Sequence, residues 1–204
     1  NKLNGKEAEK YLKMAIKRGV VNAMRVYGSM LNDGIGIPQN KVEAAKYLKL
    51  ASDNGDPLSM TLYSLMLLKG DGIEYNKEKA FYYLNKSIER GNIKAYIQFG
   101  EIYEHGIGVE IDLKEAIKYY KIASDKGDPE GMSKYARMLF RGEGIISNKE
   151  EAIKYLKMAA EKGNSYALNQ LGELILHKEY NTEIDLNAAM KYFKMAADNE
   201  DDDG

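Results

Sequence analysis

Four pairs of glycines are the first residues of this chain that could take part in chemistry. The members of each pair stand two residues apart, at Gly34 and Gly36, Gly70 and Gly72, Gly106 and Gly108, and Gly142 and Gly144. Glycine-rich turns hold phosphate groups when they follow a strand and open a helix. None of these pairs has the third glycine of a dinucleotide-binding fingerprint, and none precedes Lys followed by Ser or Thr. We therefore interpret them as turns between helices.

Histidine and cysteine would be the next candidates for catalysis or metal binding. The chain has two histidines, His105 and His177, and no cysteine. The histidines occupy the same position of a repeated helix two repeats apart, too far to share a metal ion or a proton. Without cysteine there is no disulfide, no thiolate nucleophile and no cysteine-bound zinc. We expect no catalytic residue, no metal site and no cofactor, and therefore no enzyme activity.

The spacing of polar and acidic residues in 199–204 resembles part of a calcium-binding loop. Asn199, Asp201, Asp203 and Gly204 match the first half of an EF-hand loop. The glutamate that completes such a loop is missing from the match, so we interpret residues 200–204 as an acidic tail.

The charge balance limits the kinds of partner. Lys and Arg number 30 and Asp and Glu number 31, which leaves a net charge of −1. A near-neutral chain has no electrostatic reason to bind nucleic acid or an anionic membrane surface. No run of 18 apolar residues is present, so we expect no direct insertion into a membrane. The absence of cysteine fits a reducing compartment and favours the cytoplasm.

The elements that position these residues repeat every 36 residues. The same step of 36 links Gly19, Gly55, Gly91, Gly127 and Gly163. It also links a tyrosine in each copy, at Tyr11, Tyr47, Tyr83, Tyr119 and Tyr155, with Tyr192 one residue late. A period of this length is typical of stacked supersecondary units, and we expect these tyrosines to pack between repeats.

Each repeat contains two helices. In residues 55–91, Asp56 is a suitable N-cap and Pro57 a suitable first helical residue, while Gly70 ends the helix. Asn76 begins the second helix and Gly91 ends it. In other repeats the second helix starts with a variant of the capping box, in which Asn or Asp replaces the usual Ser or Thr. The pairs are Asn40 with Glu43, Asp112 with Glu115 and Asn148 with Glu151.

The repeated motif resembles the Sel1-like repeat, a relative of the tetratricopeptide repeat. The stretch AIKYLKMAAEKG at 152–163 and the glycine pairs carry the resemblance, which covers nearly the whole chain. It implies an all-α fold, a right-handed superhelix (solenoid) of antiparallel helix pairs. We expect an orphan helix at 1–18 and one continuous solenoid at 19–199, with repeats at 19–54, 55–90, 91–126, 127–162 and 163–199.

The resemblance also implies a non-catalytic scaffold or adaptor that binds a peptide or a partner protein on its concave side, which the first helices line. The alternative is an enzyme or small-molecule binder of the bacterial type that interacts with β-lactams. Members of that type are typically held by disulfides, which this chain cannot form.

The first helix of the second repeat is the clearest candidate for a binding surface. It is apolar on its packing side and also on its other side, at Leu58, Leu62, Leu65 and Leu68. Soluble proteins seldom expose a continuous apolar patch without a partner. We therefore expect a partner helix, a peptide or a second copy of the chain to dock there, with Val26 and Ile97 extending the groove and charged residues at its rim. The other candidate binding residues on the first helices are Lys94, Ile97, Glu101, His105, Arg137, Phe140, Arg141 and Tyr166.

Overall fold

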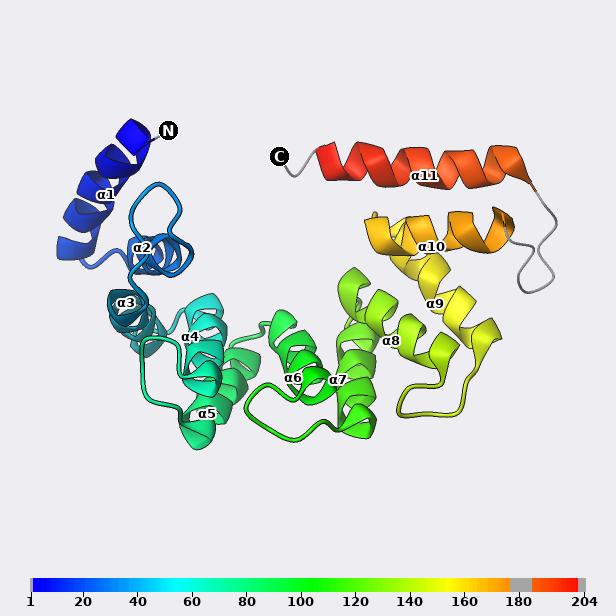
Figure 1. Ribbon diagram of the computed structural model, residues 1–204, viewed down its shortest axis with the longest axis horizontal. Helices are drawn as coiled ribbons and strands as arrows, with labels where there is room; N and C mark the ends of the chain where they lie inside the picture. Colours follow the sequence, from blue (N-terminus) through cyan, green and yellow to red (C-terminus); the bar gives the residue numbers. More distant parts are fainter. Residues whose placement is uncertain (1, 177–184, 202–204) are drawn as a thin grey trace. The chain divides into compact units, whose positions relative to one another are not determined.

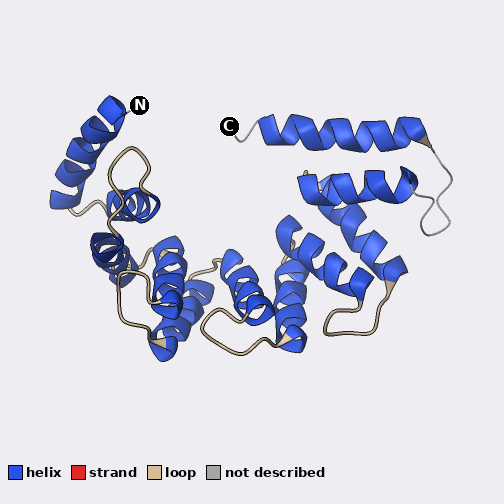
Figure 2. Ribbon diagram, in the orientation of Figure 1, coloured by secondary structure: helices blue, strands red, loops and turns tan. Residues whose placement is uncertain are grey.

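Every regular element in the described part of the chain is an α-helix (Figure 2). The structure, a computed structural model, describes residues 2–176 and 185–201, and no strand occurs in those two ranges. The described helices are α1 (Lys2–Lys17), α2 (Val21–Asp33), α3 (Lys41–Asp53), α4 (Pro57–Lys69), α5 (Lys77–Glu89), α6 (Lys94–His105), α7 (Leu113–Asp125), α8 (Pro129–Arg141), α9 (Lys149–Glu161), α10 (Ser165–Leu176) and α11 (Leu186–Asp201). The predicted all-α fold of helix pairs with a 36-residue period is confirmed.

The helices begin and end at the residues that the sequence indicates. The carboxylate of Asp56 accepts a hydrogen bond of 2.8 Å from the Ser59 backbone N–H, which is otherwise unpaired at the start of α4. Gly70 ends α4 with a φ of 67°, a left-handed conformation that glycine adopts without steric cost. The starts and ends of α4 are therefore fixed by local sequence.

The second helix of a repeat starts with a modified capping box. Asn40 Oδ1 accepts the backbone N–H of Glu43 at 3.0 Å, as predicted. The return bond differs from the usual one, because Asn40 Nδ2 donates to the Glu43 carboxylate at 3.4 Å. The backbone N–H of Asn40 is already bound to the Leu31 carbonyl at 2.8 Å, so it is not available to Glu43.

The second glycine of two pairs, Gly72 and Gly144, lies where two segments approach closely. A Cβ atom on Gly72 would lie 2.3 Å from the carbonyl carbon of Lys41, and one on Gly144 would lie 2.2 Å from the Leu113 carbonyl oxygen. Lys41 and Leu113 each begin the second helix of the preceding repeat. These two glycines therefore lie in turns that pack one repeat against the preceding one.

The chain forms two compact units, residues 1–95 and residues 96–204, and α6 crosses the boundary. In the first unit α2 packs on α3, α3 on α4 and α4 on α5, with α1 against α2 (Figure 1). In the second unit α7 packs on α8, α8 on α9, α9 on α10 and α10 on α11. Within each unit these helices therefore pack against their neighbours along the chain.

The tyrosines of the second helices pack within their own repeat, not mainly between repeats as expected. Tyr47 lies edge to face against Tyr27, with ring centroids 4.8 Å apart, and both belong to the first repeat. Tyr83 does reach the preceding repeat, because its hydroxyl donates to Asp53 at 2.8 Å. Tyr11 is 57% exposed, so the expectation of a packed ring is wrong at that position.

The C-terminal helix is longer than expected. α11 extends to Asp201, so Glu200 and Asp201 belong to the helix and not to the acidic tail predicted at 200–204. The half-match to a calcium loop at Asn199–Gly204 lies partly outside the described residues.

Candidate functional site

The apolar side of α4 offers three leucines to solvent, not four. Leu58 is 45% exposed, and Leu62 and Leu65 are partly exposed. Leu68 is 3% exposed, so its prediction as a docking residue is wrong. At 3.6 residues per turn Leu68 lies about 80° around the helix from Leu58, which turns it toward the buried side of α4.

A pocket of about 130 Å³ lies between α2 and α4. Leu62 and Leu65 of α4 and Leu48 of α3 supply its apolar wall, and α2 contributes polar groups. The pocket therefore joins the predicted leucine face to the preceding repeat. The residues that line it are Ser29, Asn32, Asp33, Leu48, Leu62, Leu65, Met66, Lys69 and Asp71.

Several polar groups around this pocket are held by neighbours. The Asp71 carboxylate pairs with the Lys41 ammonium at 2.9 Å. Asn32 Nδ2 donates to Asp33 at 2.7 Å, and the Gln39 side chain donates to the Asn32 carbonyl at 2.6 Å. The pocket thus has an apolar wall beside two carboxylates and the ammonium of Lys69.

The corresponding place between the third and fourth repeats is filled by side chains. Asn32, Leu48 and Leu65 have their counterparts 72 residues later, in Glu104, Tyr120 and Arg137. Arg137 Nη2 lies 2.7 Å from both carboxylate oxygens of Glu104, and the Tyr120 hydroxyl donates to Glu104 Oε2 at 2.7 Å. The same position of the array is therefore an open apolar pocket between the first two repeats, a closed polar network between the third and fourth, and a smaller pocket of about 30 Å³ between the fourth and fifth.

The hydrogen bonds of this network determine the ionisation of its members. Burial would raise the pKa of Glu104, but the hydrogen bonds from Arg137 and Tyr120 outweigh it and hold the pKa below its usual value. Burial, together with the Glu104 hydrogen bond, raises the pKa of Tyr120 far above its usual range. Glu104 therefore remains a carboxylate and Tyr120 a phenol at neutral pH, and neither is poised for proton transfer.

Ile97 is 1% exposed, so its prediction as part of the leucine groove is wrong. The same repeat position is also buried at Thr61, which is 7% exposed, and at Ser133, which is 3% exposed. This position points toward the neighbouring helix in several repeats, which explains the burial of Ile97.

The other predicted residues differ in how accessible they are. Glu101 pairs with Lys134 at 2.7 Å, and the Lys149 ammonium lies 5.0 Å from the ring centroid of Phe140. Tyr166 is 41% exposed. The candidates with exposed side chains are Lys94, His105, Arg141 and Tyr166.

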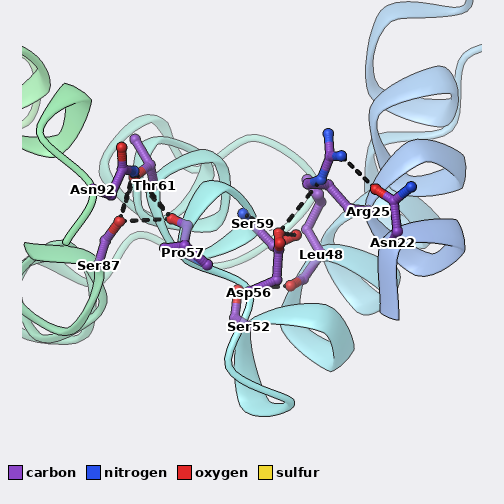
Figure 3. Close-up of polar contacts among 10 residues, drawn as sticks. All are labelled: Asn22, Arg25, Leu48, Ser52, Asp56, Pro57, Ser59, Thr61, Ser87 and Asn92. Atoms are coloured by element: carbon purple, nitrogen blue, oxygen red, sulfur yellow. Dashed lines mark hydrogen bonds and ion pairs between the residues drawn. The ribbon is translucent and has the colours of Figure 1, made fainter. Parts of the chain in front are cut away.

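A buried polar cluster at the start of α4 was not predicted from the sequence (Figure 3). The Ser87 hydroxyl donates to the Pro57 carbonyl at 2.6 Å, and Asn92 Nδ2 donates to Ser87 Oγ at 2.8 Å and to Thr61 Oγ1 at 3.1 Å. The available signal was Ser87, because the other repeats have alanine at that position. The cluster ties the end of α5 to the start of α4 and so supports the leucine face.

The structure adds no sign of metal or membrane chemistry in the residues it describes. No group of three or more His, Cys, Asp and Glu side chains could hold a metal ion in those ranges. No described helix is long and apolar enough to cross a membrane. His105 is exposed, and His177 lies outside the described residues.

A family model described as Sel1 repeat matches six segments of the chain. The matched residues are 2–20, 21–56, 57–92, 93–128, 129–164 and 165–201. A search of curated proteins found no match.

Solved structures share the fold. A Sel1 repeat protein from Oxalobacter formigenes is 25% identical with a TM-score of 0.77, and the match covers 92% of this chain and 74% of that one. A protective antigen of uropathogenic Escherichia coli with an SLR fold is 25% identical with a TM-score of 0.67, over 95% of this chain and 41% of the antigen. Helicobacter pylori cysteine rich protein B is 26% identical with a TM-score of 0.51, over 63% of this chain and 95% of that protein.

Proposed function

The chain belongs to the Sel1 repeat family, whose members generally act as scaffolds for protein interactions, and we propose that it is a non-catalytic scaffold that binds a partner peptide at the pocket between α2 and α4. The peptide lies along the exposed side of these first helices. One of its apolar side chains enters the pocket beside Leu62 and Leu65.

The observation that carries this proposal is the contrast between the pocket and its counterpart 72 residues later. At the place where Tyr120, Glu104 and Arg137 close the surface of the second unit, the first unit has smaller or apolar residues and an open pocket. An apolar pocket surrounded by polar groups is the arrangement that anchors a partner side chain in protein interfaces.

The charges beside the pocket indicate which peptides fit. Asp33 and Asp71 contribute two carboxylates, whereas Lys69 contributes one ammonium group. Lys41 neutralises part of the Asp71 charge from outside the pocket. A leucine-like side chain next to a lysine or arginine is therefore the best match, because complementary charge favours the encounter and the orientation of a partner.

The test starts from a random peptide library displayed on phage and selected on the intact protein. Enriched peptides should share an apolar residue with a neighbouring basic residue, and their affinity should be measured by fluorescence polarisation. The Leu62→Glu/Leu65→Glu double variant should bind them at least tenfold more weakly, because two carboxylates fill the apolar wall. Retained affinity in this variant, with unchanged circular dichroism, would contradict the proposal.

Two further measurements complete the test. Ile146→Glu is a matched control, since Ile146 is 89% exposed and lies outside the pocket, so this variant should bind as the unmodified protein does. Size-exclusion analysis of the double variant shows whether the same leucines support self-association. The β-lactam alternative predicts nitrocefin hydrolysis or a thermal shift with penicillin, and the scaffold proposal predicts neither.

A further inference from the structure

Four of the five repeats have an aromatic ring at the same position of the first helix. These residues are Tyr27, Tyr63, Phe99 and Tyr135, each 36 residues from the next. Each ring packs against the tyrosine of the second helix in its own repeat, with centroids 4.8 to 5.0 Å apart. The fifth repeat has Leu171 at this position, which is a smaller side chain.

A cavity of about 450 Å³ adjoins Leu171, between α9, α10 and α11. Its volume is within the range of ligand pockets, about 300 to 1,000 Å³. Leu168 and Leu171 of α10 lie at its base, where they are 0% and 4% exposed, and Tyr192 of α11 also lines it.

The groups that surround Tyr135 in the fourth repeat recur around this cavity. The Lys121 ammonium lies 5.8 Å from the Tyr135 ring centroid, and the Tyr155 ring lies 4.9 Å away. Asp125 and Glu151 are close enough to act on the Tyr135 hydroxyl electrostatically. One repeat further along the chain, the counterparts of Lys121, Asp125, Glu151 and Tyr155 are Lys157, Glu161, Ala188 and Tyr192, and all four line the cavity.

Another aromatic residue in the fifth repeat does not replace the ring. Phe193 stands where the fourth repeat has Leu156. It packs against Gly172, whose added Cβ atom would lie 2.7 Å from Phe193 Cζ. Phe193 is not among the residues that line the cavity. Phe193 therefore does not take the place of the ring that the fifth repeat lacks at Leu171.

We propose that this cavity binds the ring of a tyrosine from a partner protein. The bound ring lies beside Tyr192 and below the Lys157 ammonium, as Tyr135 lies beside Tyr155 and below Lys121. Tyrosine is favoured over phenylalanine because three of the four rings at this position are tyrosines. Glu161 and Lys157 line the same cavity and supply polar groups for the hydroxyl of the bound tyrosine. Tyrosine is one of the residues that most often anchor protein interfaces.

The first test uses p-cresol, which is the tyrosine side chain as a free molecule. In NMR spectra of the whole protein, p-cresol should give nuclear Overhauser contacts to the Leu171 methyls and the Tyr192 ring. The Leu171→Tyr variant supplies the ring from its own chain, so its affinity for p-cresol should fall at least tenfold and its melting temperature should rise. Leu176→Tyr is the matched control, because Leu176 is exposed on the same helix and does not line the cavity.

The second test selects a displayed peptide library separately on the unmodified protein and on Leu171→Tyr. Peptides enriched only on the unmodified protein should share a tyrosine. The Leu62→Glu/Leu65→Glu variant should still bind p-cresol, so this proposal and the proposed peptide site can fail separately. The inference is overturned if p-cresol shows no contact to Leu171 and Tyr192 in the unmodified protein, or if enriched peptides lack an aromatic residue. Equal p-cresol affinity of folded Leu171→Tyr would overturn it as well.

Discussion

Arg137 on α8 holds both carboxylate oxygens of Glu104 on α6 at 2.7 Å through one guanidinium nitrogen. The side chain of Glu104 is 9% exposed and that of Arg137 is 21% exposed, so the pair is mostly withdrawn from water. It joins the third repeat to the fourth within the second unit. Removal of one partner therefore leaves a charge that water cannot fully solvate.

Arg137→Leu should lower the free energy of unfolding by about 3 kcal/mol, because Glu104 then stays buried without its cation. Urea denaturation measures the loss. The double variant Glu104→Leu/Arg137→Leu should lose less, since both charges are removed and apolar side chains take their place. The counterparts of this pair 72 residues earlier are Asn32 and Leu65, which carry no charge. Equal losses in the two variants would show that the charge pair is not the source of the stabilisation.

The same carboxylate should make stability depend on acid pH. The folded-state pKa of Glu104 is lowered from its ordinary value of 4.5, although burial acts in the opposite direction. Its stabilisation is therefore complete above pH 4.5 and decreases as the pH falls through the lower folded-state pKa. The free energy of unfolding of Glu104→Gln should fall less steeply below pH 4.5 than that of the unmodified protein. Urea titrations at several pH values test this, and parallel acid profiles would contradict it.

Gly100 allows the ring of Tyr120 to approach α6. A Cβ atom on Gly100 would lie 2.4 Å from Tyr120 Cε1, so Gly100→Ala should destabilise the protein by about 2 kcal/mol through overpacking. In the second and fourth repeats, leucine stands at the position of Tyr120, and Ser64 or Ala136 stands at the position of Gly100. In a Tyr120→Leu background the same Gly100→Ala change should therefore cost less than 1 kcal/mol or stabilise the helix, by about the propensity difference between the two residues. A double-mutant cycle with additive effects would contradict this steric account.

Two buried serines should respond in opposite ways to alanine. Ser87 is fully buried, and its hydroxyl connects Pro57, Thr61 and Asn92 (Figure 3). Ser87→Ala should cost about 2 kcal/mol, because partner groups lose their hydrogen bonds inside the protein.

Ser124 is the matched comparison. It is 3% exposed, and its hydroxyl has no hydrogen-bond partner among the described residues. Ser124→Ala should leave the free energy of unfolding unchanged or raise it, since it removes an unsatisfied polar group. Thermal and urea unfolding of the two variants can be compared directly. Similar losses in both would mean that the Ser87 cluster contributes little.

The local structure of this chain could be read from its sequence because short-range chemistry determines it. Asp56 and Pro57 start a helix and Gly70 ends it wherever they stand, since they act on backbone groups a few residues away. The 36-residue period then predicts the all-α array, because each helix pair must cover the apolar side of the next. The leucine face of α4 followed from the same pattern, and three of its four leucines are indeed accessible.

The sequence by itself determined the helices, their pairing and the family. Only the tertiary structure decided which first-helix residues remain accessible, because burial depends on what lies across from a residue. Leu68 and Ile97 are covered for that reason. The two cavities were likewise decided in three dimensions. Asn32, Leu48 and Leu65 come from three different helices, and so do Lys157, Leu171 and Tyr192. Whether such residues leave a pocket or fill it depends on the summed volume of side chains that meet only after folding.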